Sequence, residues 1–173
     1  MRTGQLTRAI GFAGKQQLSL EVRRTFAAPR EKVFASWADP QQVAQWMYKD
    51  VSSHEIFHRV NDIRTGGRYE VEIRDAKKNE TYWGHGVYRE VTPPEKIVFS
   101  WNWTMGMLDG TQLHPDSQET QVTVEFFARG NSTEVVLTHA FFGSEKDRKE
   151  HHGGWNGCLD VLEKFLQSSG AAS

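Results

Sequence analysis

Five segments between residues 68 and 140 alternate apolar and polar side chains, and turn or loop sequences separate each segment from the next. An alternation with a period of two is the pattern of a β-strand that buries one face. In the first segment, Tyr69, Val71 and Ile73 share one face and charged residues occupy the other. Because turns connect most neighbouring segments, the pattern predicts an antiparallel meander. The predicted strands are 68–74, 81–91, 97–103, 120–128 and 132–140.

Four further elements are predicted before this meander. Residues 18–26 alternate well enough for a first strand, and His54–Phe57 fits a short edge strand. Between them we expect two short helices, 29–38 and 40–46, each with a proline in its first turn. Asp39 ends the first helix and caps the second.

The last element is an amphipathic helix that runs from about Ser144 to just before Gly170. Residues spaced at about 100° place one apolar stripe around Trp155. The stripe contains His151, Trp155, Cys158, Leu159, Leu162, Phe165 and Leu166. Gly153, Gly154 and Gly157 lie off the stripe or at its edge, and each weakens a helix by roughly 0.5 to 1 kcal/mol relative to alanine. We interpret these glycines as points of flexibility, or as places where another part of the backbone comes close.

Parity along the strands predicts which side chains point into the protein. The inward sets are Ile97, Phe99, Trp101 and Trp103, then Val122, Val124 and Phe126, then Val135, Leu137 and His139. The segment 81–91 is ambiguous, because its tyrosines oppose its tryptophan and valines, and two glycines suggest a bulge. We place Trp83, His85 and Val87 inward in this segment.

Three histidines, His85, His139 and His151, can then face one interior. They fit ordinary hydrogen-bonded histidines, polar anchors for a ligand, an acid–base catalyst or a zinc site. His151 and His152 diverge by about 100° on a helix, so they cannot easily bind the same ion. We predict no metal site, no cofactor and no assigned catalytic residue.

The loop 104–118 is long for a hairpin and carries Met105, Met107 and Leu108. Long loops with apolar tips are often lids or contact surfaces. A disordered excursion explains the same sequence equally well.

Composition limits the remaining possibilities. The chain has 173 residues and a net charge of −1 without a long run of Lys or Arg, which argues against a nucleic-acid partner. Its single cysteine, Cys158, excludes an internal disulfide, and its place on the buried stripe favours packing over a nucleophilic role. No segment has the length and apolarity of a membrane span, so we expect a cytoplasmic protein. We expect a leader at 1–17, one domain at 18–168 and a frayed tail at 169–173.

Five motifs in sequence order resemble the family of homologues of the activator of heat-shock-protein-90 ATPase. This family belongs to the START-like, or birch-pollen-allergen-like, superfamily, and the resemblance covers about residues 18–167. The motifs are TFAAPREKVFASWADPQQVAQWM, IRTGGRYEVEI, GVYREVTPPEKIVFSW, QVTVEFFARGNSTEVVLTH and GGWNGCLDVLEKFL. The resemblance implies an α+β helix-grip fold, in which a curved antiparallel sheet wraps a long C-terminal helix, two short helices close one end and an apolar cavity remains. It also implies a possible chaperone partner.

The sequence and the resemblance together predict a protein, monomeric or homodimeric, that binds a small apolar or lipid-like molecule in this cavity. One alternative is a cyclase-like or hydrolase-like enzyme that uses a cavity histidine, and another is a chaperone-interacting module. The predicted ligand-binding residues are Tyr69, Val71, Trp83, His85, Phe99, Trp101, Trp103, Val124, Phe126, His139, His151, Trp155 and Leu159.

Overall fold

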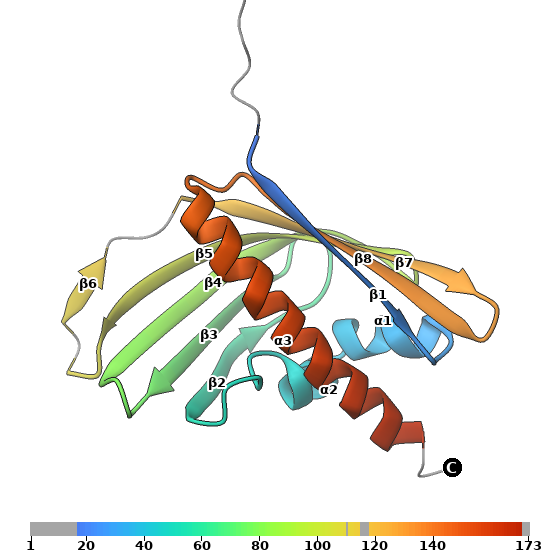
Figure 1. The fold of residues 1–173 in the computed structure, drawn as a ribbon, viewed down its shortest axis with the longest axis horizontal. Coiled ribbons are helices and arrows are strands. Elements are labelled where there is room, and N and C mark those ends of the chain that lie inside the picture. Colours follow the sequence, from blue (N-terminus) through green and yellow to red (C-terminus); the bar gives the residue numbers. More distant parts are fainter. Residues whose placement is uncertain (1–16, 110, 115–117, 171–173) are drawn as a thin grey trace, which may run out of the picture.

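A curved antiparallel sheet and one long helix form the fold in the computed structural model, which describes residues 17–109, 111–114 and 118–170 (Figure 1). The elements, in chain order, are β1 (Ser19–Phe26), α1 (Arg30–Ala38), α2 (Pro40–Trp46), β2 (His54–Asn61), β3 (Arg68–Asp75), β4 (Glu80–Thr92), β5 (Lys96–Met107), β6 (Gln112–His114), β7 (Thr120–Arg129), β8 (Ser132–Ala140) and α3 (Glu145–Gly170). The strands lie in the order β1-β8-β7-β5-β4-β3-β2, and β6 pairs with β5. The predicted α+β helix-grip architecture and its meander are confirmed.

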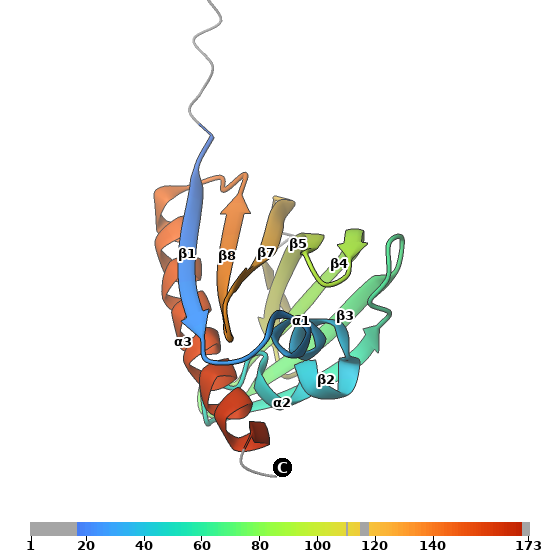
Figure 2. The same ribbon diagram turned by 90° about the vertical axis from the view of Figure 1, so that its right-hand side faces the viewer.

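The helix α3 runs beside β1 on the inner side of the curved sheet, while α1 and α2 lie at one end (Figure 2). Its buried residues form the predicted stripe, from Trp155 and Cys158 to Leu159, Leu162 and Leu166. Arg24 on β1 donates a hydrogen bond of 2.7 Å to Asp160 on α3. These contacts fix one long edge of the helix to the first strand.

The two short helices begin and pack as predicted. The Asp39 carboxylate accepts a hydrogen bond of 2.9 Å from the backbone N–H of Gln41 and so caps α2. Trp46 is completely buried and donates to the Ser36 carbonyl at 2.8 Å. Its ring centroid lies 4.7 Å from that of Trp37. The indole pair therefore locks α1 against α2.

The predicted loop 104–118 is partly wrong. Residues 104–107 continue β5, because β4 extends far enough to pair with them, as Glu80 opposite Met107 shows. A short strand, β6, follows at Gln112–His114. Residues 110 and 115–117 lie outside the described part of the chain, as do 1–16 of the predicted leader and 171–173 of the predicted tail.

The inward sets predicted on β3, β5, β7 and β8 are confirmed, with Val122, Val124 and Leu137 completely buried. On β4 the prediction is wrong, because His85 and Val87 are exposed and Trp83 lies with them on the outer face. The inward residues of β4 are instead Tyr82, Gly84, Gly86 and Tyr88.

Close neighbours on β3 and β5 account for the inward glycines of β4. A Cβ at Gly84 would lie 2.9 Å from Cγ1 of Val71 and 3.0 Å from Cη2 of Trp103. A Cβ at Gly86 would lie 2.0 Å from the Ser100 carbonyl oxygen and 2.7 Å from Cε1 of Tyr69. Side chains of both neighbouring strands, and the β5 backbone at Gly86, thus occupy the space that side chains on β4 would need. Glycine at these positions allows bulky rings to pack against the strand itself.

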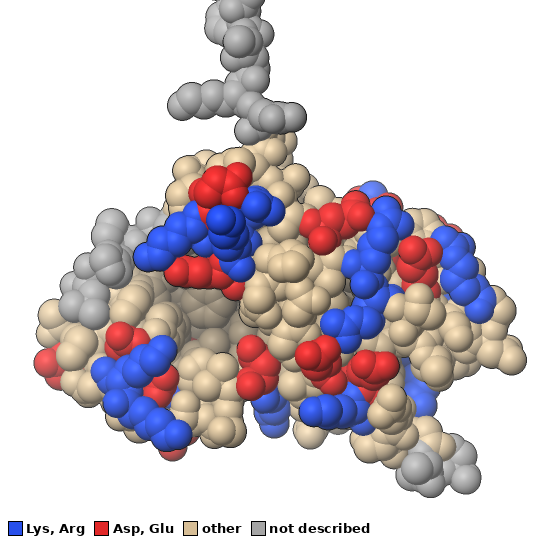
Figure 3. Space-filling model, viewed as in Figure 1, with Lys and Arg blue, Asp and Glu red and all other residues tan. Residues whose placement is uncertain are grey.

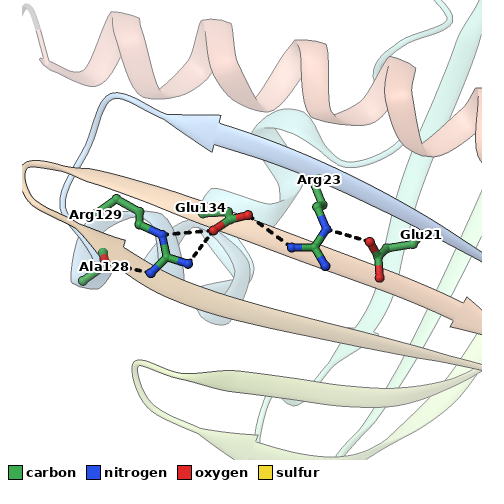
Figure 4. Close-up of polar contacts among 5 residues, drawn as sticks. All are labelled: Glu21, Arg23, Ala128, Arg129 and Glu134. Carbon is green, nitrogen blue, oxygen red and sulfur yellow. Dashed lines mark hydrogen bonds and ion pairs between the residues drawn. The ribbon is translucent and has the colours of Figure 1, made fainter.

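A row of ion pairs links charged side chains on β1, β8 and β7 (Figure 4). Glu134 accepts hydrogen bonds from Arg129 at 2.6 Å and from Arg23 at 3.3 Å, and Arg23 also binds Glu21 at 2.6 Å. The Arg129 hydrogen bonds, with those of Arg23, lower the pKa of the Glu134 carboxyl. This polar face contrasts with the apolar inner face. Within the described residues, no helix has the length and apolarity needed to cross a membrane.

We predict that Gly86→Ala destabilises the fold by about 2 kcal/mol or more, because the added methyl overlaps the backbone of β5. The control is Gly153→Ala, where nothing lies within 4 Å of the added Cβ. There we expect stabilisation of about 0.5 to 1 kcal/mol from helix propensity. Urea unfolding measures both, and equal effects of the two changes would contradict this packing of β4.

Candidate functional site

A cavity of about 570 Å³ lies between the first half of α3 and the sheet. Figure 3 shows the molecule hollowed on this side. The helix packs mainly on β1 and α2, so the far ends of β3, β4 and β5 extend beyond the surface that it covers. Side chains from these ends, from residues 47–51 after α2, and from α3 form the walls.

Aromatic and sulfur-containing side chains make up most of the wall. Trp101 is central, because its ring centroid lies 5.4 Å from that of Trp103 and 5.2 Å from that of Trp155. The Tyr48 ring meets Trp103 edge-on at 5.8 Å. The remaining apolar lining consists of Met47, Val51, Ile73, Tyr82, Met105 and Phe142.

His139 lies directly behind this wall and is completely buried. The indole N–H of Trp155 donates to His139 Nδ1 at 3.1 Å. His139 Nε2 lies 2.7 Å from the Thr120 hydroxyl, which in turn lies 3.1 Å from the Trp101 carbonyl oxygen. An indole N–H can only donate, so Nδ1 accepts and Nε2 carries the proton. The proton of Nε2 is then donated to Thr120, and the Thr120 proton to the carbonyl.

Both ring nitrogens of His139 are therefore used within the protein. Burial, together with the nearby His151, lowers the pKa of His139 to about 3. A neutral imidazole without a free lone pair cannot act as a general base for a bound molecule. Its role in this arrangement is to hold Trp155, and with it α3, against the sheet.

Two histidines, His54 and His151, line the cavity, and His151 is the one on α3. Its Nδ1 lies 2.8 Å from the Asp147 carbonyl oxygen one turn earlier in α3, so Nδ1 donates and Nε2 keeps its lone pair. The ring centroid lies 5.2 Å from that of Phe142 and 5.1 Å from that of His139. His151 can thus offer a single hydrogen-bond acceptor to a molecule in the cavity.

The cavity also reaches Cys158 and Asp50. The Cys158 thiol lies 3.7 Å from the Asp50 carboxylate, and burial, with the negative charge of Asp50, raises the pKa of Cys158 to about 12. Such a thiol is a poor nucleophile.

A Cβ at Gly157 would lie 2.8 Å from Oδ2 of Asp50. The close neighbour of this glycine is therefore a side chain and not backbone, which was one of the two interpretations of these glycines.

Gly153 and Gly154 have open space around the position of an added Cβ, and Gly154 lines the cavity. The two glycines are adjacent on α3, yet only Gly154 faces the cavity wall. This difference makes them a matched pair for filling the cavity.

The structure brings four of the thirteen predicted ligand-binding residues onto the cavity wall. These are Trp101, Trp103, His151 and Trp155. Tyr69, Val71 and Phe99 line a second, much smaller cavity of about 30 Å³, which has room for about one water molecule.

The other six predicted residues lie elsewhere. Val124, Phe126, His139 and Leu159 are buried in the solid core. Trp83 and His85 line a hollow of about 600 Å³ on the outer face of the sheet. Their predicted inward placement is wrong, because Gly84 and Gly86 take the inward positions beside them.

Sequence reasoning missed much of the wall. Ile73 and Met105 had detectable signals, since Ile73 was on an inward face and Met105 was an apolar residue of the predicted loop. Tyr48 had none, because it lies between α2 and β2 in a left-handed backbone conformation with φ of 64°. The other lining residues that were missed are Met47, Asp50, Val51, His54, Tyr82, Gln118, Thr120, Phe142, Gly143, Asp147, Glu150 and Cys158.

A metal centre has no donor set in the described part of the chain, where no group of three His, Cys, Asp or Glu side chains is placed to hold an ion. The cavity is thus defined by apolar surface with polar groups at its edge.

We predict that the stability gained by keeping His139 neutral is present above about pH 6.5 and is lost as the pH falls towards 3. In this window the unfolded chain binds a proton at His139 and the folded chain does not. The variant His139→Asn keeps one acceptor and one donor but does not titrate. The stability advantage of wild type over the variant, measured as unfolding free energy, should therefore shrink as the pH falls. The slope of this decrease should approach about 1.4 kcal/mol per pH unit. Urea titrations from neutral to acidic pH measure it, and parallel pH profiles would contradict the assignment.

Comparisons with known proteins agree with this fold. The family described as "Activator of Hsp90 ATPase homolog 1-like protein" matches residues 27–167. An AHSA1 protein from Silicibacter pomeroyi is 22% identical, with a TM-score of 0.72 over 88% of this chain and 99% of that one. An uncharacterised protein from Rhizobium leguminosarum is 23% identical, with a TM-score of 0.70 over 88% and 96%.

A further solved structure, an AHSA1-like protein from Aeromonas hydrophila, is 22% identical, with a TM-score of 0.65 over 88% of this chain and 94% of that one. The comparison with curated proteins found no match. The likeness to the solved structures shows the fold, and the family match spans nearly all of the domain. The chain belongs to the family of activator of Hsp90 ATPase homolog 1-like proteins.

Proposed function

We propose that this protein binds a small apolar or lipid-like molecule in the cavity between the sheet and α3. The observation that carries the proposal is the open volume of about 570 Å³, which lies within the range of about 300 to 1,000 Å³ that is typical of small-molecule sites. The protein's own side chains leave this space unfilled, although its walls are apolar.

The lining supports a ligand with a large apolar part. Rings of Trp101, Trp103 and Tyr48, with the methionines Met47 and Met105, offer an apolar surface. Burial of a ligand's apolar surface against it contributes about 25 cal/mol per Å². His151 and the groups at the edge would orient a polar end.

An enzyme that uses a cavity histidine is less well supported. The hydrogen bonds of His139 occupy both of its nitrogens, and the thiol of Cys158 stays protonated. His151 has a free acceptor, but its Nδ1 donates to the Asp147 backbone carbonyl and not to a carboxylate. Ligand binding therefore accounts for the cavity without requiring a catalytic base, which the enzyme hypothesis needs.

A chaperone partner is the alternative that the family name suggests. Such a partner would use the outer surface and would not need the cavity. The two functions are separated by changes that fill the cavity without altering the outside of the protein.

We predict that Gly154→Leu abolishes uptake of an apolar fluorescent dye, because the new side chain projects into open space at the cavity wall. Gly153→Leu is the matched control, since it is exposed one residue earlier and does not line the cavity. Dye titration and native mass spectrometry of gently purified protein give the readout. Circular dichroism confirms that both variants are folded.

Loss of dye binding in Gly154→Leu, with dye binding retained in Gly153→Leu, supports the proposal. Equal binding by both variants, or no dye binding and no co-purified molecule in the wild type, would refute it. Capture of a chaperone that Gly154→Leu leaves intact would instead favour the outer surface as the functional one.

A further inference from the structure

We infer that the cavity selects cationic amphiphiles, which are molecules with an apolar body and an amine or quaternary ammonium end, over fatty-acid-like anions. The inference rests on the proposed function and names the ligand class. Two independent features carry it, namely the sign of the charges on the cavity wall and the aromatic surface beside them.

Among the residues that the structure describes, the formally charged side chains on the wall are acidic. Asp50, Asp147 and Glu150 line the cavity, and this described lining contains neither Lys nor Arg. Acidic residues thus come from two sides, with Asp50 after α2 and the other two on the first half of α3. Among the described lining residues, the basic groups are the histidines His54 and His151. A negative end of a ligand therefore meets no Lys or Arg of this lining, while Lys146 lies 3.9 Å from the lining residue Glu150.

The acids are only partly neutralised by their neighbours. Glu150 lies 3.9 Å from Lys146, and both side chains are exposed, so this pair is weak. The nearby Arg148 binds Glu145. Within the described residues, Asp50 and Asp147 form no ion pair, and their side chains bind the Cys158 thiol and the Ser144 hydroxyl.

The histidines of the wall do not make its charge positive. His54 lies 3.6 Å from the buried carboxylate of Asp75, so a proton on His54 would be compensated by that acid. His151 donates from Nδ1 to a carbonyl and presents an acceptor from Nε2. An acceptor suits an ammonium N–H and not a carboxylate.

The aromatic wall supplies the second feature. Trp101, Trp103, Tyr48 and Tyr82 lie on the same cavity as the acids. The faces of such rings attract cations, and Trp does so most strongly. Burial raises the pKa of the Tyr48 phenol well above its usual range, so this ring stays neutral. Carboxylates at the edge and indoles inside together match an ammonium group on an apolar chain.

Three probes of equal chain length test the inference. Decyltrimethylammonium, decanol and decanoate are titrated into the full chain at low ionic strength and about pH 8, where an ordinary imidazole is neutral. Isothermal calorimetry and tryptophan fluorescence report binding. We expect the cation to bind at least about tenfold more tightly than decanoate, with decanol between them.

The variants Asp50→Asn and Glu150→Gln remove charge from the wall. Each should reduce the preference for the cation over decanoate by about threefold. Glu31→Gln, an exposed acid on α1 away from the cavity, is the control and should leave the preference unchanged.

The outcomes separate the two proposals. Equal affinity for the three probes, or tighter binding of decanoate, would overturn the charge selectivity while the binding function stands. Failure of all three probes to bind would overturn both.

Discussion

The hydrogen bond from Trp155 to His139 is the interaction on which the rest of the structure depends. It joins α3 to β8 at a point where the histidine is completely buried, and Trp101 packs against the same indole. On the C-terminal side of this point, Leu159, Leu162 and Leu166 close the helix onto the sheet. On the N-terminal side no apolar stripe continues, and the cavity begins. The anchor therefore sets where packing ends and open volume starts.

The same anchor leaves His139, on the inner face, without a free ring nitrogen. Its two nitrogens link Trp155 to Thr120 and the backbone of Trp101, so the polar chain is satisfied entirely within the wall. Buried polar groups with complete partners specify one arrangement of a core. This arrangement places two indoles at the cavity surface and keeps the imidazole behind them.

The sequence was sufficient for the architecture because most strands alternate clearly. Ile97, Phe99 and Trp101 show the parity of β5 without ambiguity, and the stripe around Trp155 shows the inner face of α3. The parity of β4 was misread because Gly84 and Gly86 have no side chain to mark the inward face. The structure shows that Val71 and Trp103 fill that space at Gly84, and that the Ser100 backbone and Tyr69 fill it at Gly86. The parts of the cavity wall that lie on strands and on α3 could be predicted from sequence periodicity. Tyr48 and Asp50 lie in irregular backbone, whose direction no periodicity predicts.

The central claim is that the space between the sheet and the first half of α3 receives an apolar molecule. Nuclear Overhauser contacts between bound decanol and the protein test it most directly. We expect contacts to Trp103, Met105 and Trp155, which line the cavity. Contacts confined to Trp83 and Val87 on the outer face of β4, or no contacts at saturating decanol, would contradict it.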